Sequence, residues 1–168
     1  MKIIKTASEF YSWQKNQSKT LGFVPTLGAL HKGHLSLIKA SKEQCYITVV
    51  SIFLNPTQFV ACEDLDSYPN TLEVDIKRLE NMCVDLLFLP TKEEMYDNVE
   101  PVDVPTTALF RKLEGASRPH FFYGVTTIVA KLFNIIQPTH TFFGEKDAQQ
   151  LYIIKQMIVQ MQYPIILV

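Results

Sequence analysis

Residues 46–54 constrain the fold most, because they form a nearly unbroken apolar and β-branched run. The segment reads Tyr-Ile-Thr-Val-Val-Ser-Ile-Phe-Leu. Such runs are typical of strands that are buried on both faces, as in parallel sheets. Residues 19–24 and 84–89 are two further apolar strand candidates. We expect Pro25 and Pro90 to end them, because proline has no N–H group to give to a sheet ladder.

Segments with helical spacing of apolar residues separate these strands. Helices are predicted at residues 6–17, 33–43, 71–82, 106–113, 124–137 and 147–162, and two more strands at 139–143 and 164–168. Strands that alternate with helices favour parallel pairing through crossover helices. The prediction is therefore an α/β fold with a doubly wound parallel sheet. No internal repeat or linker interrupts it, so we interpret residues 1–168 as a single domain.

Composition narrows the class of protein. The 168 residues are 47% hydrophobic and 20% charged, with a formal net charge of -1. These values are typical of a globular protein and offer no electrostatic case for nucleic acid or an anionic membrane. The N-terminus does not resemble a signal peptide, and Cys45, Cys62 and Cys83 form no redox or zinc spacing. We expect a cytoplasmic protein with reduced thiols.

The stretch from Gly22 to His34 is the strongest candidate site. An apolar strand turns through glycine, and His31 and His34 then flank Gly33 where a helical pattern begins. A helix N-terminus offers backbone N–H groups and a positive dipole end to an anion. Histidines add side-chain donors and, when protonated, can neutralise charge on a leaving pyrophosphate. This arrangement predicts a nucleotide-phosphate site.

Polar segments follow two other predicted strands. Asn55 and Gln58 come after the second strand, and Gly144–Asp147 with Gln150 comes after the fourth. The carboxyl ends of parallel strands share one edge of the sheet, where ligands bind. Lys146 could reach phosphate as a point charge, and Asp147 could orient a ribose hydroxyl, the lysine or a magnesium ion. The neutral amides could orient a small polar substrate, and no serine or cysteine has a base nearby for covalent catalysis.

Each motif also has a structural explanation when it is taken alone. Two histidines three residues apart could be a surface feature or half of a zinc site, although a third ligand and a glutamate base are missing at typical spacings. The Glu145-Lys146-Asp147 triplet could be a solvated surface, and Asn-Pro is an ordinary turn. The expected convergence of the three segments on one sheet edge favours the functional interpretation.

Four motifs together resemble a known family. They are Thr-Leu-Gly-Ala-Leu-His-Lys-Gly-His at 26–34, Ser-Ile-Phe-Leu-Asn-Pro-Thr-Gln-Phe at 51–59, Asp-Leu-Asp-Ser-Tyr-Pro at 64–69 and Phe-Phe-Gly-Glu-Lys-Asp-Ala-Gln-Gln at 142–150. In this order and spacing they closely resemble bacterial pantothenate synthetases, the pantoate–β-alanine ligases. The histidine motif alone points only to the wider nucleotidyltransferase superfamily, whose domains are Rossmann-like and of the HUP type.

The resemblance implies a two-step ligation. Pantoate and ATP with Mg²⁺ would give pantoyl adenylate and pyrophosphate, and β-alanine would then displace AMP to form pantothenate. It also implies a homodimer without nucleic-acid or membrane partners, and magnesium that is carried with ATP and has no direct protein ligand.

The resemblance further implies roles for individual residues. His34, His31 and Lys146 would be catalytic, with His34 the proton donor. ATP would contact Leu27, Gly28, Ala29, Leu30, His31, Lys32, Gly33, His34, Gly144, Glu145, Lys146 and Asp147. Pantoate and β-alanine would contact Gln58, Gln150, Asn55, Val125 and Ile128.

The sequence departs from the family pattern at several positions. Leu27 replaces the usual methionine, Asn70 replaces an arginine, and the histidine of a Pro-Gly-His-Phe motif lies one place early at His120, leaving Phe121 in its position. The family's later Ser-Ser-Arg motif and C-terminal domain are also missing. We therefore expect an N-terminal domain with little or no ligase activity by itself. Two alternatives to the ligase interpretation are another nucleotidyltransferase and a non-catalytic nucleotide-binding or assembly domain.

Overall fold

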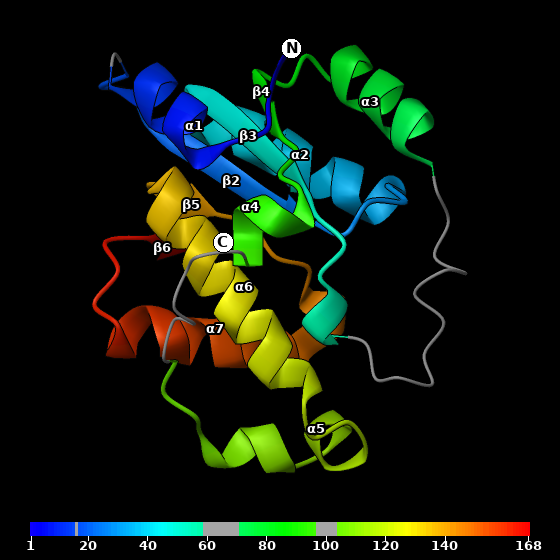
Figure 1. The fold of residues 1–168 in the computed structure, drawn as a ribbon, viewed down its shortest axis with the longest axis vertical. Coiled ribbons are helices and arrows are strands. Elements are labelled where there is room, and N and C mark those ends of the chain that lie inside the picture. The colour runs from blue at the N-terminus through cyan, green and yellow to red at the C-terminus, as the bar shows by residue number, and fades with distance from the viewer. Residues whose placement is uncertain (16, 59–70, 97–103) are drawn as a thin grey trace.

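A parallel sheet forms the centre of the molecule. The computed structural model describes residues 1–15, 17–58, 71–96 and 104–168. Within these residues the sheet has six strands, all paired in parallel, in the order β1-β4-β3-β2-β5-β6 (Figure 1). The strands are β1 Lys2–Ile4, β2 Leu21–Thr26, β3 Ile47–Ile52, β4 Leu86–Phe88, β5 His140–Thr141 and β6 Ile166–Leu167.

Helices cover both faces of this sheet. The α-helices are α1 Ala7–Gln14, α2 Lys32–Gln44, α3 Leu72–Asn81, α4 Lys92–Tyr96, α5 Glu114–Ser117, α6 Phe121–Ile136 and α7 Ala148–Gln160. The 3-10 turns are η1 Pro56–Gln58, η3 Ala108–Arg111 and η4 Glu145–Asp147. Phe23 of β2 packs with Phe133 of α6 in one core, and its neighbour Val24 joins Ile38 of α2 in a second. The predicted doubly wound α/β fold is thus confirmed.

The strand order reverses between β2 and β5. From β2 the chain moves through β3 to β4 on one side, whereas β5 and β6 lie on the other side. Gly22 pairs with His140, and Phe23 pairs with Thr141, at this junction. In sheets of this type the crevice at the reversal, outside the carboxyl ends of the strands, is where ligands bind.

The prediction that Pro25 ends its strand is wrong. Pro25 lies inside β2 and stands opposite Ser51 of β3. Phe23 accepts a hydrogen bond at its carbonyl from the N–H of Phe142, on the β5 side. Pro25, two residues later, faces the same side, beyond the last residue of β5. The proline therefore costs the sheet no ladder hydrogen bond, which explains why a central strand tolerates it.

Other boundaries also differ from the predictions. β1 and α4 were not expected, because three- and five-residue elements are too short to show a periodic pattern. The helix predicted at 106–113 is the shorter 3-10 turn η3, α5 forms where a loop was expected at 115–119, and α6 begins at Phe121, before Gly124. No helix in the described residues is both long and apolar enough to cross a membrane. Cys45 is buried and Cys83 is exposed, both as free thiols, and Cys62 lies outside the described residues.

Candidate functional site

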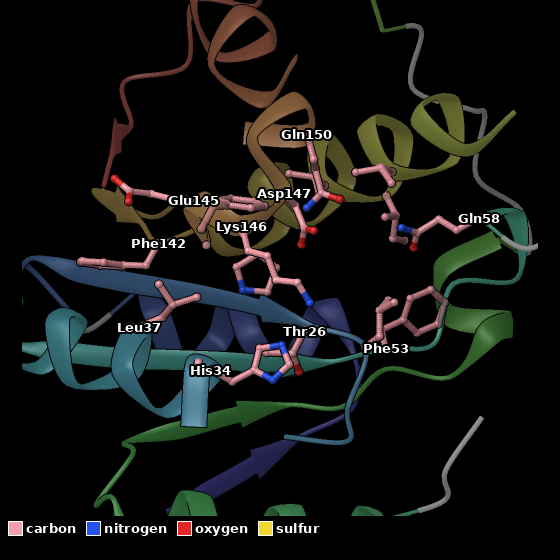
Figure 2. A pocket seen from close by; sticks show the side chains of 18 of the residues that line it. Thr26, His34, Leu37, Phe53, Gln58, Phe142, Glu145, Lys146, Asp147 and Gln150 are labelled. Carbon is pink, nitrogen blue, oxygen red and sulfur yellow. The ribbon is translucent and has the colours of Figure 1, made fainter. Parts of the chain in front are cut away.

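A cleft of about 720 Å³ opens at the reversal of strand order. Thr26 and Leu27 line it from the carboxyl end of β2, and Phe142 to Gly144 line it from the carboxyl end of β5. Further side chains that face it come from α2, η1, α5, α6, η4 and α7, and several of them are labelled in Figure 2. The three polar segments singled out in the sequence therefore meet in one place, as their positions after successive strands predict.

His31 and His34 together cap the start of α2. His31 is the N-cap residue, and its Nδ1 accepts a hydrogen bond from the N–H of Gly33 at 3.0 Å. In return, His34 Nδ1 accepts from the N–H of His31 at 3.4 Å. This is the reciprocal arrangement of a capping box, made here by two imidazoles. Because both Nδ1 atoms accept, the proton of each neutral ring is assigned to Nε2, which remains available as a donor.

The two rings lie close together, and the pKa of His34 is affected. Their centroids are 4.1 Å apart, with an interplanar angle of 30°. Burial lowers the pKa of His34, and the charge of His31 lowers it further, whereas Asp75 and Asp147 oppose this effect. His34 is therefore preferentially neutral when no ligand is bound. An anion in the cleft would stabilise its protonated form, which suits a group that responds to phosphate.

The segment between β5 and α7 forms the opposite wall of the cleft. Lys146 and Glu145 are exposed residues of η4, and Asp147 immediately precedes α7 without making a capping hydrogen bond. All three line the cleft. Figure 2 shows Lys146 and Asp147 on the α7 side and His34 on the α2 side. A ligand between the two walls would meet a lysine ammonium on one side and histidine N–H donors on the other.

Gln58 and Gln150 place two amide groups in the same cleft. Gln58 lies in η1 and is 7% exposed, and Gln150 is a half-buried residue in the first turn of α7. The Oε1 atom of Gln58 is buried and has no hydrogen-bond partner among the described residues. A buried polar atom without a partner costs free energy unless a ligand or water satisfies it. Gln58 therefore presents an acceptor to whatever enters the cleft.

Asn55 lies behind the wall of the cleft and does not line it. The residue is fully buried, and its Nδ2 donates to the carbonyl of Gly124 on α6 at 3.0 Å. Its Oδ1 accepts from the Tyr96 hydroxyl, from the Thr57 N–H at 3.3 Å and from the Thr57 hydroxyl at 3.0 Å. A Cβ atom at Gly124 would lie only 2.6 Å from the Thr57 carbonyl oxygen, so this glycine lets η1 approach α6 closely. The contacts of Asn55 thus fix the turn that carries Gln58.

An apolar wall completes the cleft. Val125 and Ile128 of α6 line it, as the resemblance implied, together with Phe53 and Phe121. Phe121 thus lies in the cleft although it occupies the position where the family has a histidine.

Only part of the first predicted ATP segment faces the cleft. Its lining residues are Leu27, His31, Gly33 and His34. The other four residues, Gly28, Ala29, Leu30 and Lys32, do not line it. Gly28 and Ala29 have φ values of 92° and 49°, which turn the chain from β2 towards α2. The side chain of Leu30 is buried in the core beneath α2 and α3, and so it does not reach the cleft.

Arg118 is a cleft residue that the sequence analysis missed. It forms an ion pair with Glu114 at 3.1 Å, and its guanidinium carbon lies 3.9 Å from the centroid of the Phe121 ring. Its Nη2 also donates to the backbone carbonyl of Gln58 at 3.4 Å. The segment gave no periodic signal, and the role of Arg118 depends on contacts distant in sequence. His120 does not line the cleft.

Some residues named in the sequence analysis lie outside the described part of the chain. They are Phe59, the Asp-Leu-Asp-Ser-Tyr-Pro motif at 64–69 and Asn70. Within the described part, no group of three or more histidine, cysteine, aspartate or glutamate side chains is arranged to hold a metal ion. The zinc interpretation of the histidine pair therefore has no support from these residues.

Comparison with known proteins shows the family of this chain. The sequence model described as Pantoate-beta-alanine ligase matches residues 2–168. The chain belongs to the pantoate–β-alanine ligase family. It is 49% identical to the pantothenate synthetase of Fervidobacterium nodosum over 161 residues, which are 94% of this chain and 58% of that protein. It is 47% identical to the Staphylococcus haemolyticus pantothenate synthetase over 167 residues, 98% of this chain and 59% of that protein.

Solved structures of this family have the same fold. Pantothenate synthetase from Thermus thermophilus superposes with a TM-score of 0.93 at 40% identity, over 100% of this chain and 60% of that one. The pantoate–β-alanine ligase from Francisella tularensis, solved in complex with β-γ ATP and β-alanine, gives 0.94 at 39% identity, over 100% of this chain and 66% of that one. The chain spans about three fifths of the length of the curated relatives it matches.

Proposed function

We propose that this chain is the nucleotide- and pantoate-binding part of a ligase that condenses pantoate with β-alanine. The whole protein would consume ATP and release pyrophosphate and AMP. The observation that carries the proposal is the shared cleft: paired histidines at a helix start, a lysine on the facing wall and the unpaired buried oxygen of Gln58. The family relationship suggests β-alanine as the amine substrate, since the related Francisella protein was solved with β-γ ATP and β-alanine.

In the first step the pantoate carboxylate attacks the α-phosphorus of ATP. The bond from carboxylate oxygen to phosphorus forms as the bond to the β-phosphate oxygen breaks, so pyrophosphate leaves and pantoyl adenylate remains. The reaction needs in-line geometry and stabilisation of charge rather than a protein nucleophile. His31 and His34 would donate from Nε2 to the phosphates, and Lys146 would neutralise charge from the opposite wall. Mg²⁺ enters as part of the Mg·ATP substrate.

Pantoate carries hydroxyl groups, a carboxylate and two methyl groups on one carbon, and the cleft offers a counterpart to each. Gln58 Oε1 would accept a hydrogen bond from a hydroxyl, and Gln150 would hold a second polar group. Val125 and Ile128 would pack against the methyl groups. The guanidinium of Arg118, which is paired with Glu114, would offer N–H donors to the carboxylate at this end of the cleft.

In the second step the β-alanine amine attacks the acyl carbon of the adenylate. The new C–N bond replaces the bond to the phosphate oxygen, AMP leaves, and the nitrogen loses a proton. An adenylate bound in the cleft would have to be shielded from water until the amine arrives. We further propose that residues 1–168 form one Rossmann-like domain of a cytoplasmic homodimer. The shared fold of the related structures supports the domain assignment.

Calorimetric titration of the chain with Mg·ATP and with pantoate tests the proposal. Gln58→Ala is expected to weaken pantoate binding by roughly tenfold while leaving ATP binding unchanged, because one buried hydrogen bond is worth about 1.5 kcal/mol. Gln160→Ala, an exposed change at the other end of α7, is the matched control. Absence of ATP binding in a folded sample would refute the proposal. Binding of ATP without pantoate, with pyrophosphate release on another acceptor, would favour a different nucleotidyltransferase.

A further inference from the structure

A buried carboxylate on α3 lies outside the cleft but holds the segment that leads to the histidines. Asp75 is 1% exposed. Its Oδ1 accepts from the N–H of Leu30 at 3.0 Å, and its Oδ2 accepts from the Thr71 hydroxyl at 2.9 Å. Arg78, one helical turn later, lies 3.3 Å from Asp75 Oδ1 and donates to the carbonyl of Leu30. Two side chains of one helix, 45 and 48 positions later in the chain, therefore bind both polar backbone groups of Leu30.

Leu30 joins a left-handed turn to the cap of α2. The preceding residues, Gly28 and Ala29, have φ values of 92° and 49°. A left-handed conformation in a residue other than glycine costs about 1–3 kcal/mol and persists where surrounding contacts enforce it. Leu30 is anchored by its buried side chain and by Asp75 and Arg78. The next residue is His31, so these contacts set the point from which the capping pair begins.

Asp75 also contributes to the electrostatic environment of His34. The groups that act on this imidazole are His31 at the start of the same helix, Asp75 from α3 and Asp147 at the start of α7. Lys146 faces it across the cleft (Figure 2). Of these four groups, Asp75 does not line the cleft. Its carboxylate also accepts a hydrogen bond from the backbone N–H of Leu30, the residue before His31.

We propose that Asp75 and Arg78 are positioning residues for the histidine pair. By holding Leu30 at its N–H and its carbonyl, they determine where His31 and His34 present their Nε2–H groups to a phosphate. The inference rests on the proposed function for the identity of the ligand, whereas the positioning of the two histidines does not depend on that identity. Neither residue lines the cleft, so neither is expected to touch the substrate.

Four variants of the chain test this inference, one of them a control and one, Arg78→Lys, a conservative replacement. Asp75→Asn keeps an acceptor for Leu30 but removes the charge, and Arg78→Gln shortens the donor that reaches the Leu30 carbonyl. Glu73→Gln, an exposed acidic residue of the same helix, is the matched control. NMR titration of the His31 and His34 imidazoles reports on the site without any ligand, and calorimetry gives the Mg·ATP affinity.

Asp75→Asn is expected to lower the pKa of His34, because a negative charge that favours the imidazolium is lost. It should also weaken Mg·ATP binding by about tenfold, because Arg78 loses its charged partner and holds the Leu30 carbonyl less firmly. Arg78→Gln should weaken ATP binding by about threefold or more. Arg78→Lys, which can still donate to Leu30, should keep most of the ATP affinity. Glu73→Gln should change neither the imidazole titrations nor the ATP affinity.

The outcomes separate the inference from the proposed function. If Asp75→Asn and Arg78→Gln leave both the His34 titration and the ATP affinity as in the unmodified chain, the inference is wrong while ATP binding by the chain stands. If the unmodified chain binds no ATP, the proposed function fails, and the imidazole titrations of Arg78→Gln, which keeps the Asp75 charge, still decide the positioning role. Should Asp75→Asn not fold, Arg78→Gln decides, because the Arg78 side chain is 43% exposed and tolerates substitution.

Discussion

Replacing Asn55 with alanine is expected to destabilise the protein and to loosen the turn that carries Gln58. The amide links three elements: η1 through Thr57, α6 through the Gly124 carbonyl, and α4 through the Tyr96 hydroxyl. The residue is completely buried, so water cannot replace these contacts without opening the core. The substitution therefore tests whether η1 is held by this one side chain.

The magnitude follows from the bonds that are lost. The two long-range hydrogen bonds, to Gly124 and from Tyr96, are worth about 1 kcal/mol each. The Thr57 N–H is left without its acceptor, which adds about 1 kcal/mol. The total of about 3 kcal/mol is a large part of the roughly 5–15 kcal/mol that stabilises a typical domain. For a chain of this size it corresponds to a fall in melting temperature of roughly 6–12 °C.

Urea unfolding, followed by circular dichroism and by the fluorescence of Trp13, the single tryptophan, measures this loss. Tyr96→Phe should cost about 1 kcal/mol, and the double variant should lose less than the sum, because both changes remove the same bond. Asn81→Ala, at an exposed position on α3, is the control. A loss below about 0.5 kcal/mol for Asn55→Ala, no greater than that of an ordinary surface change, would refute the reasoning.

Three further predictions concern the same site. Gly124→Ala should lower stability by about 2 kcal/mol in urea unfolding, although alanine favours helices, because its Cβ would lie 2.6 Å from the Thr57 carbonyl oxygen; unchanged stability would show that η1 moves freely. Gln58→Leu should leave stability equal or higher, because it removes a buried oxygen without a partner, while pantoate binding measured by calorimetry falls at least tenfold; retained binding would contradict the assignment. Burial holds the pKa of His34 below its ordinary value, so the unfolded chain takes up the proton first, and stability should fall as pH drops below about 6.5. His34→Gln should flatten this dependence between about pH 7 and 5, and identical pH profiles would rule out His34 as its source.

Much of the site was predictable from local sequence. Polar segments that follow apolar strands must meet at one sheet edge if the strands are parallel, and this placed His31, His34, Lys146 and Gln150 in a common cleft. Asn55 was harder to interpret. The sequence shows an asparagine next to a proline. Only the packing of η1 against α6 shows that its amide donates to the carbonyl of Gly124 and does not face the cleft.

The sequence by itself determined the alternation of strands and helices, the glycine turn and the histidine pair, because these depend on hydrophobic periodicity and on local backbone preferences. The tertiary structure decided which residues act across distance. Arg118 reaches Gln58, and Asp75 reaches Leu30, over separations for which sequence spacing carries no signal. Pro25 is a further example. The sequence shows that proline lacks an N–H group, but only the structure shows that β5 has already ended beside it, so that no hydrogen bond is lost. Contacts of this kind arise only when the strands have paired into the sheet and the crossover helices have packed against it.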